Sequence, residues 1–309
     1  MGNLGPSEGV IAWLLDAEPA IRWQVMRDLT DTPAEIVTAE RSRIATEGWG
    51  ASLLDRQRPD GQWGDGVAEP FWWTNMYTLL WLRDLGIDPT SDRARAAINR
   101  VRDVTWGPEF ADSPFFEGEV EPCINGRVVA LGAYFDVRSD RLVDRLLGEQ
   151  LADGGWNCQA KISPRSSFHT TICVLEGLLA FEQAFGASAA VTDARTRGHE
   201  YLLERRLLRR LSTGEIINPL WTQFAFPPLW HYDVLRALDY LRAAGVPPEP
   251  RLEEGISIVL ERRQADGRWL CDVRHRASLY DGLAGPLEAP NRWITLRALR
   301  VLDRYAAVA

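Results

Sequence analysis

The stretch QRPDGQW at residues 57–63 returns as QLADGGW at 150–156 and, one residue shorter, as QADGRW at 264–269. In each copy the Asp-Gly pair predicts a tight turn that ends a helix. The tryptophan that follows supplies a large apolar side chain beneath the turn, and the glutamine can hydrogen-bond the backbone of a neighbouring repeat. Three copies of one connection predict a chain assembled from repeated helical units.

Six proline-led segments with a leucine-rich helical pattern accompany these connections. Proline suits the first turn of a helix, because its missing N–H would have no partner there anyway. The six expected inner helices cover residues 19–29, 70–85, 122–135, 164–181, 228–241 and 290–305. Residues 93–102, 140–151, 192–211 and 251–263 place apolar residues three and four apart, which indicates outer helices buried on one face. We therefore predict an all-α fold, a single (α/α)6 toroid over residues 1–309.

These repeats resemble those of a known family of helical enzymes. Residues 57–63 and 150–156 are strict copies of Gln-x-x-x-Gly-x-Trp, the QW motif of squalene and oxidosqualene cyclases. Residues 121–132 are similar to the inner-helix repeats of squalene cyclases, and residues 168–178 to the helix of protein prenyltransferase β subunits whose histidine binds zinc. The resemblance covers nearly the whole chain and implies a terpenoid cyclase-like toroid with its site in the central cavity. The family's catalytic motifs, Asp-x-Asp-Asp and Asp-Asp-x-x-Asp, are absent from the sequence.

Polar residues recur at one offset in the expected inner helices. Counting five residues on from each leading proline gives Gln24, Asn75, Arg127, His169, Asp233 and Thr295. Because polar groups are costly in an apolar core, we expect these six to face a shared, hydrated or ligand-filled cavity. The alternative is that they hydrogen-bond one another and hold the helices together. His169 and a desolvated Asp233 are candidates for acid–base catalysis, with Arg127 as the partner of an anionic group.

Cysteine and histidine at the ends of adjacent inner helices predict a metal site. Cys123 opens the third inner helix, Cys158 precedes the fourth, and His169 lies in its first turns. These residue types are good zinc ligands, and three of them leave a position for water or substrate. Glu121 is an alternative oxygen ligand; the resemblance to prenyltransferase β subunits implies the set Glu121, Cys123 and His169. The competing interpretation is that the cysteines act as small apolar side chains.

Aromatic residues gather near the starts of the same helices. Their ring faces can shield a carbocation or stack on a flat apolar ligand, although each of them can equally be a core residue. Together with Asn75, the expected substrate-binding residues are Trp72, Trp73, Trp230, Tyr232 and Trp293.

Three functions fit these features. The leading expectation is an enzyme, similar to terpene cyclases and prenyltransferases, that acts on an isoprenoid or other apolar small molecule by cyclisation, isomerisation or prenyl transfer. The alternatives are a zinc-dependent enzyme with a Cys/Cys/His site, and a non-catalytic toroid that binds a ligand or serves as a scaffold. A prenyltransferase role would require a separate helical α subunit, a partner that we do not favour.

The charge and the cysteine content of the chain restrict its possible binding partners and its cellular compartment. A net charge of −8 and a pI near 5.2 disfavour nucleic acid and anionic lipid, which carry the same sign. The early apolar run at residues 10–15 is too short to form a transmembrane segment. Four widely spaced cysteines suit free thiols or metal ligands in a reducing compartment. We therefore expect a cytoplasmic protein.

Overall fold

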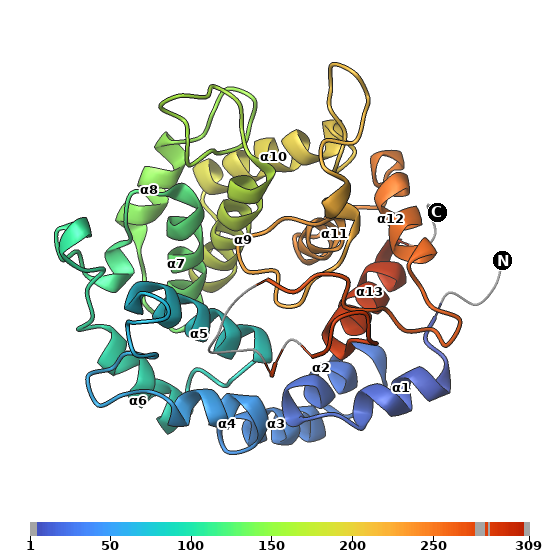
Figure 1. The fold of residues 1–309 in the computed structure, drawn as a ribbon, viewed down its shortest axis with the longest axis horizontal. Coiled ribbons are helices and arrows are strands. Elements are labelled where there is room, and N and C mark those ends of the chain that lie inside the picture. The colour runs from blue at the N-terminus through green and yellow to red at the C-terminus, as the bar shows by residue number, and fades with distance from the viewer. Residues whose placement is uncertain (1–4, 276–281, 284, 306–309) are drawn as a thin grey trace. The chain divides into compact units, whose positions relative to one another are not determined.

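The computed structural model describes residues 5–275, 282–283 and 285–305 of the chain (Figure 1). All regular structure in these residues is helical, and they form no strand. The all-α prediction is therefore confirmed. The chain divides into two compact units: a central unit, Thr38–Gly198, and a terminal unit, Met1–Val37 with His199–Ala309. A closed toroid and a single domain stay predictions.

The central unit contains the helices around the first two repeated connections. In chain order they are α4 (Gly48–Asp55), α5 (Phe71–Leu85), α6 (Asp92–Val101), α7 (Pro122–Tyr134), α8 (Asp140–Gly148) and α9 (Phe168–Phe185). α3 (Ala34–Ser42) and α10 (Ala189–Glu204) cross the boundaries of the unit, and 3-10 turns lie at η1 (Arg43–Ala45), η2 (Pro108–Phe110) and η3 (Phe115–Glu117). The leucine-rich helices α5, α7 and α9 are buried over most of their length, whereas α6 and α8 bury one face. The two helix types expected from the hydrophobic pattern are thus present.

Helices α7 and α9 lie side by side in close contact (Figure 1). The contact depends on a glycine in each helix. A Cβ atom added at Gly126 would lie 2.5 Å from the carbonyl oxygen of Cys173, and one added at Gly177 would lie 2.1 Å from the carbonyl oxygen of Gly126. Side chains cannot approach backbone so closely, so a larger residue at either position would push the helices apart. This approach brings the start of α7 next to the start of α9.

The terminal unit is built around the last helix of the chain. It contains α1 (Glu8–Leu15), α2 (Pro19–Leu29), α11 (Val234–Ala243), α12 (Glu253–Glu261) and α13 (Arg292–Tyr305), with 3-10 turns η4 (Pro219–Thr222) and η5 (Pro250–Leu252). α13 packs against α11 and α2. Arg300 pairs with Asp28 of α2, and Arg297 pairs with Asp239 of α11 at 3.1 Å. Because a charge left alone in such packing is costly, these ion pairs fix which faces of the three helices meet.

Most helix boundaries agree with the prediction, and two inner helices differ from it. α2, α5, α7 and α13 begin within two residues of the expected positions. α9, however, begins at Phe168 rather than at residue 164, and α11 begins at Val234 rather than at residue 228. The side chains of Ser167 and Asp233 accept N–H groups of the first turns, and such N-caps fix where a helix starts. The leading prolines of these two segments therefore lie in the connections.

The predicted outer helices are α6, α8, α10 and α12. The largest difference is in α10, which ends at Glu204 although the pattern extends to residue 211. Arg206 and Leu207 have φ values of 46° and 68°. These left-handed conformations cannot continue a right-handed helix, so the chain turns there.

The tryptophans of the three repeated connections make the same pair of hydrogen bonds. Trp63, Trp156 and Trp269 are fully buried. Each indole Nε1 donates to a carbonyl of the preceding outer helix at 2.7 Å: Leu53 in α4, Leu146 in α8 and Val259 in α12. Each backbone N–H donates to a side-chain oxygen of the following inner helix at 2.9–3.0 Å: Asn75 in α5, Thr171 in α9 and Thr295 in α13. Each tryptophan therefore joins two consecutive helices.

The glutamines of the connections reach a neighbouring helix in two of the three copies. Gln57 donates Nε2 to the carbonyl of Ala97 in α6 at 2.9 Å, and Gln150 donates to the carbonyl of Ala194 in α10 at 2.8 Å. In the third copy, which is one residue shorter, Gln264 donates to the carbonyl of Arg262 two residues earlier. The expected bond to a neighbouring repeat is confirmed for the two full-length copies.

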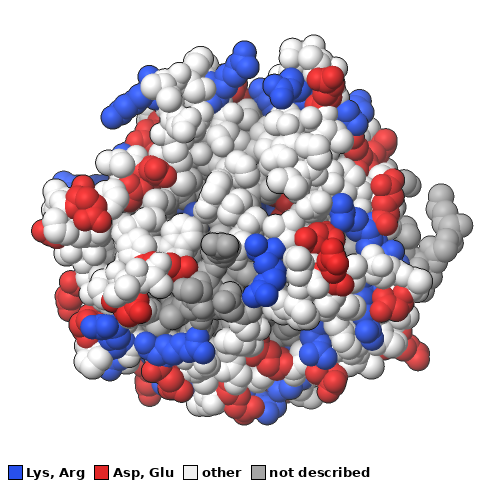
Figure 2. Space-filling model, in the orientation of Figure 1, with Lys and Arg blue, Asp and Glu red and all other residues white. Residues whose placement is uncertain are grey.

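Surface charge is mixed in sign. The face drawn in Figure 2 carries scattered acidic and basic side chains of both signs, separated by uncharged areas. Within the described residues, the helices are all too short or too polar to cross a membrane.

We predict that Gln150→Ala destabilises the protein more than Gln264→Ala. The first change removes the part-buried hydrogen bonds to the carbonyls of Gly154 and Ala194, and such bonds typically contribute about 0.5–1.5 kcal/mol each. The second removes a local bond of an exposed residue and should change the free energy of unfolding by less than about 0.5 kcal/mol. Urea denaturation of both variants measures the difference. Equal losses would contradict a linking role for Gln150.

Candidate functional site

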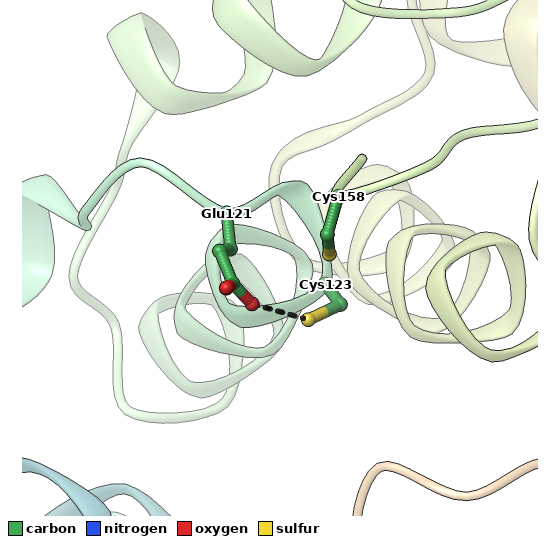
Figure 3. A group of neighbouring side chains, drawn as sticks. All are labelled: Glu121, Cys123 and Cys158. Atoms are coloured by element: carbon green, nitrogen blue, oxygen red, sulfur yellow. Dashed lines mark hydrogen bonds between the residues drawn. The ribbon is translucent and has the colours of Figure 1, made fainter. Parts of the chain in front are cut away.

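Two cysteines and a glutamate converge where α7 and α9 begin (Figure 3). One ligand atom each of Glu121, Cys123 and Cys158 lies within 4.8 Å of the other two. The Cys123 thiol donates to Glu121 Oε2 at 3.5 Å. Glu121 is exposed, and both cysteines are half-buried, so the group can be reached from solvent.

Three separate features of the fold position these residues. Glu121 is the N-cap residue of α7, and Cys123 lies in the first turn that follows. Cys158 belongs to the connection between α8 and α9, where Thr170 of α9 contacts its sulfur and its N–H, both at 3.4 Å. Because α7 and α9 touch through their glycines, the two segments meet at one end of the helix pair.

The two thiols influence each other's ionisation. A hydrogen bond between the two cysteine side chains, an alternative for the Cys123 proton to its bond with Glu121, lowers the pKa of Cys158 below its usual range. The same hydrogen bond, followed by burial, raises the pKa of Cys123. A metal ion that binds both sulfurs would displace their protons.

The donor set fits a zinc ion. Two thiolates and a carboxylate are ligands that zinc accepts, and three protein ligands leave one tetrahedral position open. Two sulfurs bonded to one zinc at about 2.3 Å lie about 3.8 Å apart. The three ligand atoms lie within 4.8 Å of one another, close enough to bind one ion after small side-chain rotations.

His169, the predicted third ligand, lies outside this group. Among the described residues, the group that the structure brings together contains Glu121, which was the alternative ligand, and not His169. His169 is the second residue of α9 and is half-buried, and its carbonyl accepts the Cys173 thiol at 3.0 Å. Because α9 begins four residues later than expected, His169 stands at the helix start rather than one turn inside. Its roles in catalysis and metal binding stay predictions.

Arg127 links three helices of the central unit. It is 3% exposed, and it donates to Tyr77 Oη of α5 at 3.2 Å and to Cys173 Sγ of α9 at 3.0 Å. Its guanidinium also lies over the Tyr77 ring, 5.5 Å from the centroid. The positive charge favours a thiolate at Cys123, one turn earlier in α7. The predicted partner of an anionic group therefore lies next to the thiols.

His169 does not share the register of Asn75 and Thr295, and a cavity faced by all six predicted polar residues stays a prediction. Thr171, not His169, makes in α9 the bond that Asn75 and Thr295 make in their helices. Gln24 accepts from Arg300 at 2.9 Å. Gln24, Asn75 and Thr295 thus join helices through bonds to Arg300 and to two tryptophan N–H groups, whereas the alternative expected bonds among the six polar residues themselves. Nδ2 of Asn75 is buried without a hydrogen-bond partner.

Asp233 is the predicted catalytic residue that carries a buried carboxyl group. It caps α11 by accepting the Arg236 N–H at 2.7 Å and is 6% exposed. Burial raises its pKa from 3.8 to about 6, against the lowering effects of that hydrogen bond and of the charges of Arg297 and Arg236. The Asp233 carboxyl can therefore hold a proton close to neutral pH.

The predicted substrate-binding aromatics fall into two groups. Trp72 and Trp73 of α5 are half-buried, and Trp230 is 39% exposed and stacks on His231. Tyr232 and Trp293 are buried: the Tyr232 hydroxyl donates to the Leu207 carbonyl at 2.6 Å, and Trp293 stacks on Phe226 at 4.8 Å. The first three rings have accessible surface, whereas the last two pack in the core.

Sequence reasoning missed the polar residues that support the thiol group. Thr170 holds Cys158, Cys173 links Arg127 to α9, and Glu119 bonds the backbone of Glu121. The repetition of glutamate at residues 117, 119 and 121 was the one available signal for Glu119. Thr170 gave none, because its contact with Cys158 depends on how the connection folds back on the first turn of α9.

Comparison with solved structures finds similarity of fold. The type II terpene cyclase MstE from Scytonema, without ligand, aligns with 94% of this chain and 88% of its own at 18% identity and a TM-score of 0.47. The similarity concerns the fold. A variant of MstE in complex with geranylgeranyl dihydroxybenzoate, its substrate, aligns with 97% of this chain and 88% of its own at 18% identity and a TM-score of 0.46. A protein from Actinoplanes aligns with 93% of this chain and 90% of its own at 18% identity and a TM-score of 0.45.

Each of these alignments covers more than nine-tenths of the chain. No family model and no curated protein matches its sequence.

We predict that Asp233→Asn raises stability at high pH more than at low pH. With a pKa of about 6 in the folded state and 3.8 as the unfolded reference, the carboxyl binds its proton more tightly when folded. Its favourable contribution is therefore present below pH 3.8 and is lost as the pH rises through about 6. Asparagine keeps the cap without a charge. The variant should gain up to roughly 3 kcal/mol relative to wild type between pH 4 and pH 8.

Denaturation at several pH values tests this. Asp140→Asn is the control, because Arg138 lowers the pKa of the exposed Asp140, and its stability difference should change in the opposite direction. A pH-independent difference for Asp233→Asn would contradict the raised pKa.

Proposed function

We propose that the protein is an enzyme that binds Zn²⁺ through Cys123, Cys158 and Glu121 and uses it on a small-molecule substrate. The convergence of two thiols and a carboxylate at one accessible place carries this proposal. A zinc ion with three protein ligands supplies a Lewis-acid position at which a thiol, a water molecule or a substrate heteroatom becomes reactive.

The surrounding residues are suited to hold such a site. Two thiolates and a carboxylate carry three negative charges, which a divalent cation only partly neutralises. Arg127 supplies a further positive charge and is fixed by its bonds to Tyr77 and Cys173. In this proposal Thr170 orients Cys158, and Arg127 offsets the remaining negative charge or receives an anionic group of the substrate.

We propose an isoprenoid or another apolar small molecule as the substrate. The half-buried rings of Trp72 and Trp73 lie in the same unit as the thiol group. The segments that carry Glu121 and Cys158 also present exposed apolar side chains, Val120 at 67% and Ile162 at 82% exposure. These surfaces support a substrate with an apolar part next to a polar or ionised end. A cytoplasmic location and the absence of an obligatory protein α subunit belong to the same proposal.

A second candidate function is favoured by Asp233. A carboxyl with a pKa of about 6 retains a proton in part of the molecules near neutrality and can protonate an alkene or an epoxide. Asp233 would then initiate cyclisation or isomerisation of an isoprenoid, and the exposed Trp230 ring, three residues earlier, would lie close to the developing cation. This chemistry needs no metal at the thiol group.

We predict that the purified protein binds about one zinc ion per chain and that Cys123→Ser and Cys158→Ser each remove it. Cys271→Ser is the matched control, because Cys271 is buried in the terminal unit and its thiol donates to the Val273 carbonyl at 3.4 Å. Elemental analysis after dialysis against zinc gives the stoichiometry. Zinc bound equally by Cys158→Ser and wild type, or by neither, would contradict this assignment.

Under the second candidate function, Asp233→Asn should slow product formation by about 100-fold or more. Geranylgeraniol and geranylgeranyl diphosphate are suitable probes, with products detected by gas chromatography and mass spectrometry. The wild-type rate should fall as the pH rises through about 6, since the acid form of Asp233 is then lost. Turnover that requires zinc and persists in Asp233→Asn would contradict the second candidate function and support the zinc mechanism.

A further inference from the structure

Glu119 lies two residues before the proposed ligand Glu121, outside the ligand group. It is only 5% exposed, a depth that carboxylates rarely reach. One of its oxygens accepts the N–H of Glu121 at 2.7 Å, and the other accepts the N–H of Val120. The side chain therefore folds back on its own segment and holds the backbone of the ligand residue.

The backbone of Glu119 is itself held by two helices. Asn125 of α7 accepts the Glu119 N–H at 2.8 Å and donates to the Glu119 carbonyl at 2.9 Å. Arg145 of α8 donates to the carbonyls of Glu119 and Val120. Gly118 permits this approach: its φ is 73°, and a Cβ atom there would lie 2.4 Å from Asn125 Oδ1. The segment that leads into the metal site is thus fixed from both sides.

Fixing this segment matters because Glu121 is the exposed member of the group. An exposed glutamate loses side-chain conformational entropy when it coordinates a metal. If its backbone is already held in place, no further backbone entropy is lost on binding. Two successive N–H groups also need two acceptors. A carboxylate offers two, whereas the amide of glutamine offers one oxygen and turns an NH₂ donor toward the other N–H.

We infer that Glu119 is a positioning residue of the metal site, which aims the carboxylate of Glu121 at Cys123 and Cys158. This inference rests on the proposed zinc function. Glu119 does not touch the metal and acts through the main chain of Glu121. A purely structural Glu119 would affect the stability of the fold and leave the metal affinity of the folded protein unchanged.

Cobalt titration of the full chain tests the inference. In wild type, Co²⁺ should give a thiolate-to-metal charge-transfer band from Cys123 and Cys158. In Glu119→Gln this band should persist, because both thiols remain, while the affinity for Co²⁺ falls by about 10–100-fold. The control is Glu117→Gln, an exposed residue of the same segment, which should bind as wild type does.

A double-mutant cycle separates positioning from a general loss of structure. If Glu119 acts through Glu121, then Glu119→Gln should cause little further loss of affinity once Glu121→Gln is present. Full additivity of the two losses would overturn the inference, as would wild-type Co²⁺ affinity in a folded Glu119→Gln. Absence of the charge-transfer band in wild type would instead overturn the zinc function itself, and this inference with it.

Arg145→Met provides a second variant if Glu119→Gln does not fold. Arg145 is exposed in α8, and its loss releases the carbonyls of Glu119 and Val120 without touching either carboxylate. The Co²⁺ affinity should fall in the same direction by a smaller factor, and this fall should vanish in the Glu121→Gln background. Unchanged affinity in Arg145→Met would contradict positioning through this segment.

Discussion

The backbone contact between α7 and α9 is the constraint on which the candidate metal site depends. Gly126 and Gly177 let the helices approach until a carbonyl of one touches the Cα of the other. At that distance the residues at the helix starts become neighbours, although Cys123 and Cys158 are separated by a whole outer helix in sequence. A side chain at either position would push the two helices apart and with them the segments that carry the sulfurs.

Around this contact, polar groups are used in successive layers. The thiols and the Glu121 carboxylate form the inner layer. Thr170 bonds Cys158, Glu119 bonds the backbone of Glu121, and Arg127 acts on Cys123 through its charge. Buried polar groups of this kind are tolerable because each has a partner, and their bonds restrict the geometry of the layer inside. A site of three ligands supported in this way can bind a metal and still leave one position for a reacting group.

The repeated connections show how one structural task is met by different residues. The tryptophan N–H groups are accepted by an asparagine in α5 and by threonines in α9 and α13. In all three copies the acceptor is an oxygen of a short side chain at the same place relative to the tryptophan. A buried N–H without any acceptor would destabilise the fold, whereas replacing one acceptor by another costs little. The position therefore requires a hydrogen-bond acceptor, and either asparagine or threonine can provide it.

Local chemistry was sufficient to predict the repeats, the helix types, the buried tryptophans and the cysteine-containing metal candidate. Asp-Gly turns, leucine periodicity and the indole side chain act within a few residues, so the sequence alone displays them. The local sequence did not show whether His169 or Glu121 lies beside Cys123 and Cys158. That outcome depended on a cap at Ser167 that delays the start of α9 and on the approach of α9 to α7. A shift of four residues moves a helical side chain about 6 Å along the helix axis and keeps it on nearly the same face. Only the packing of α9 against α7 selects which side chains meet.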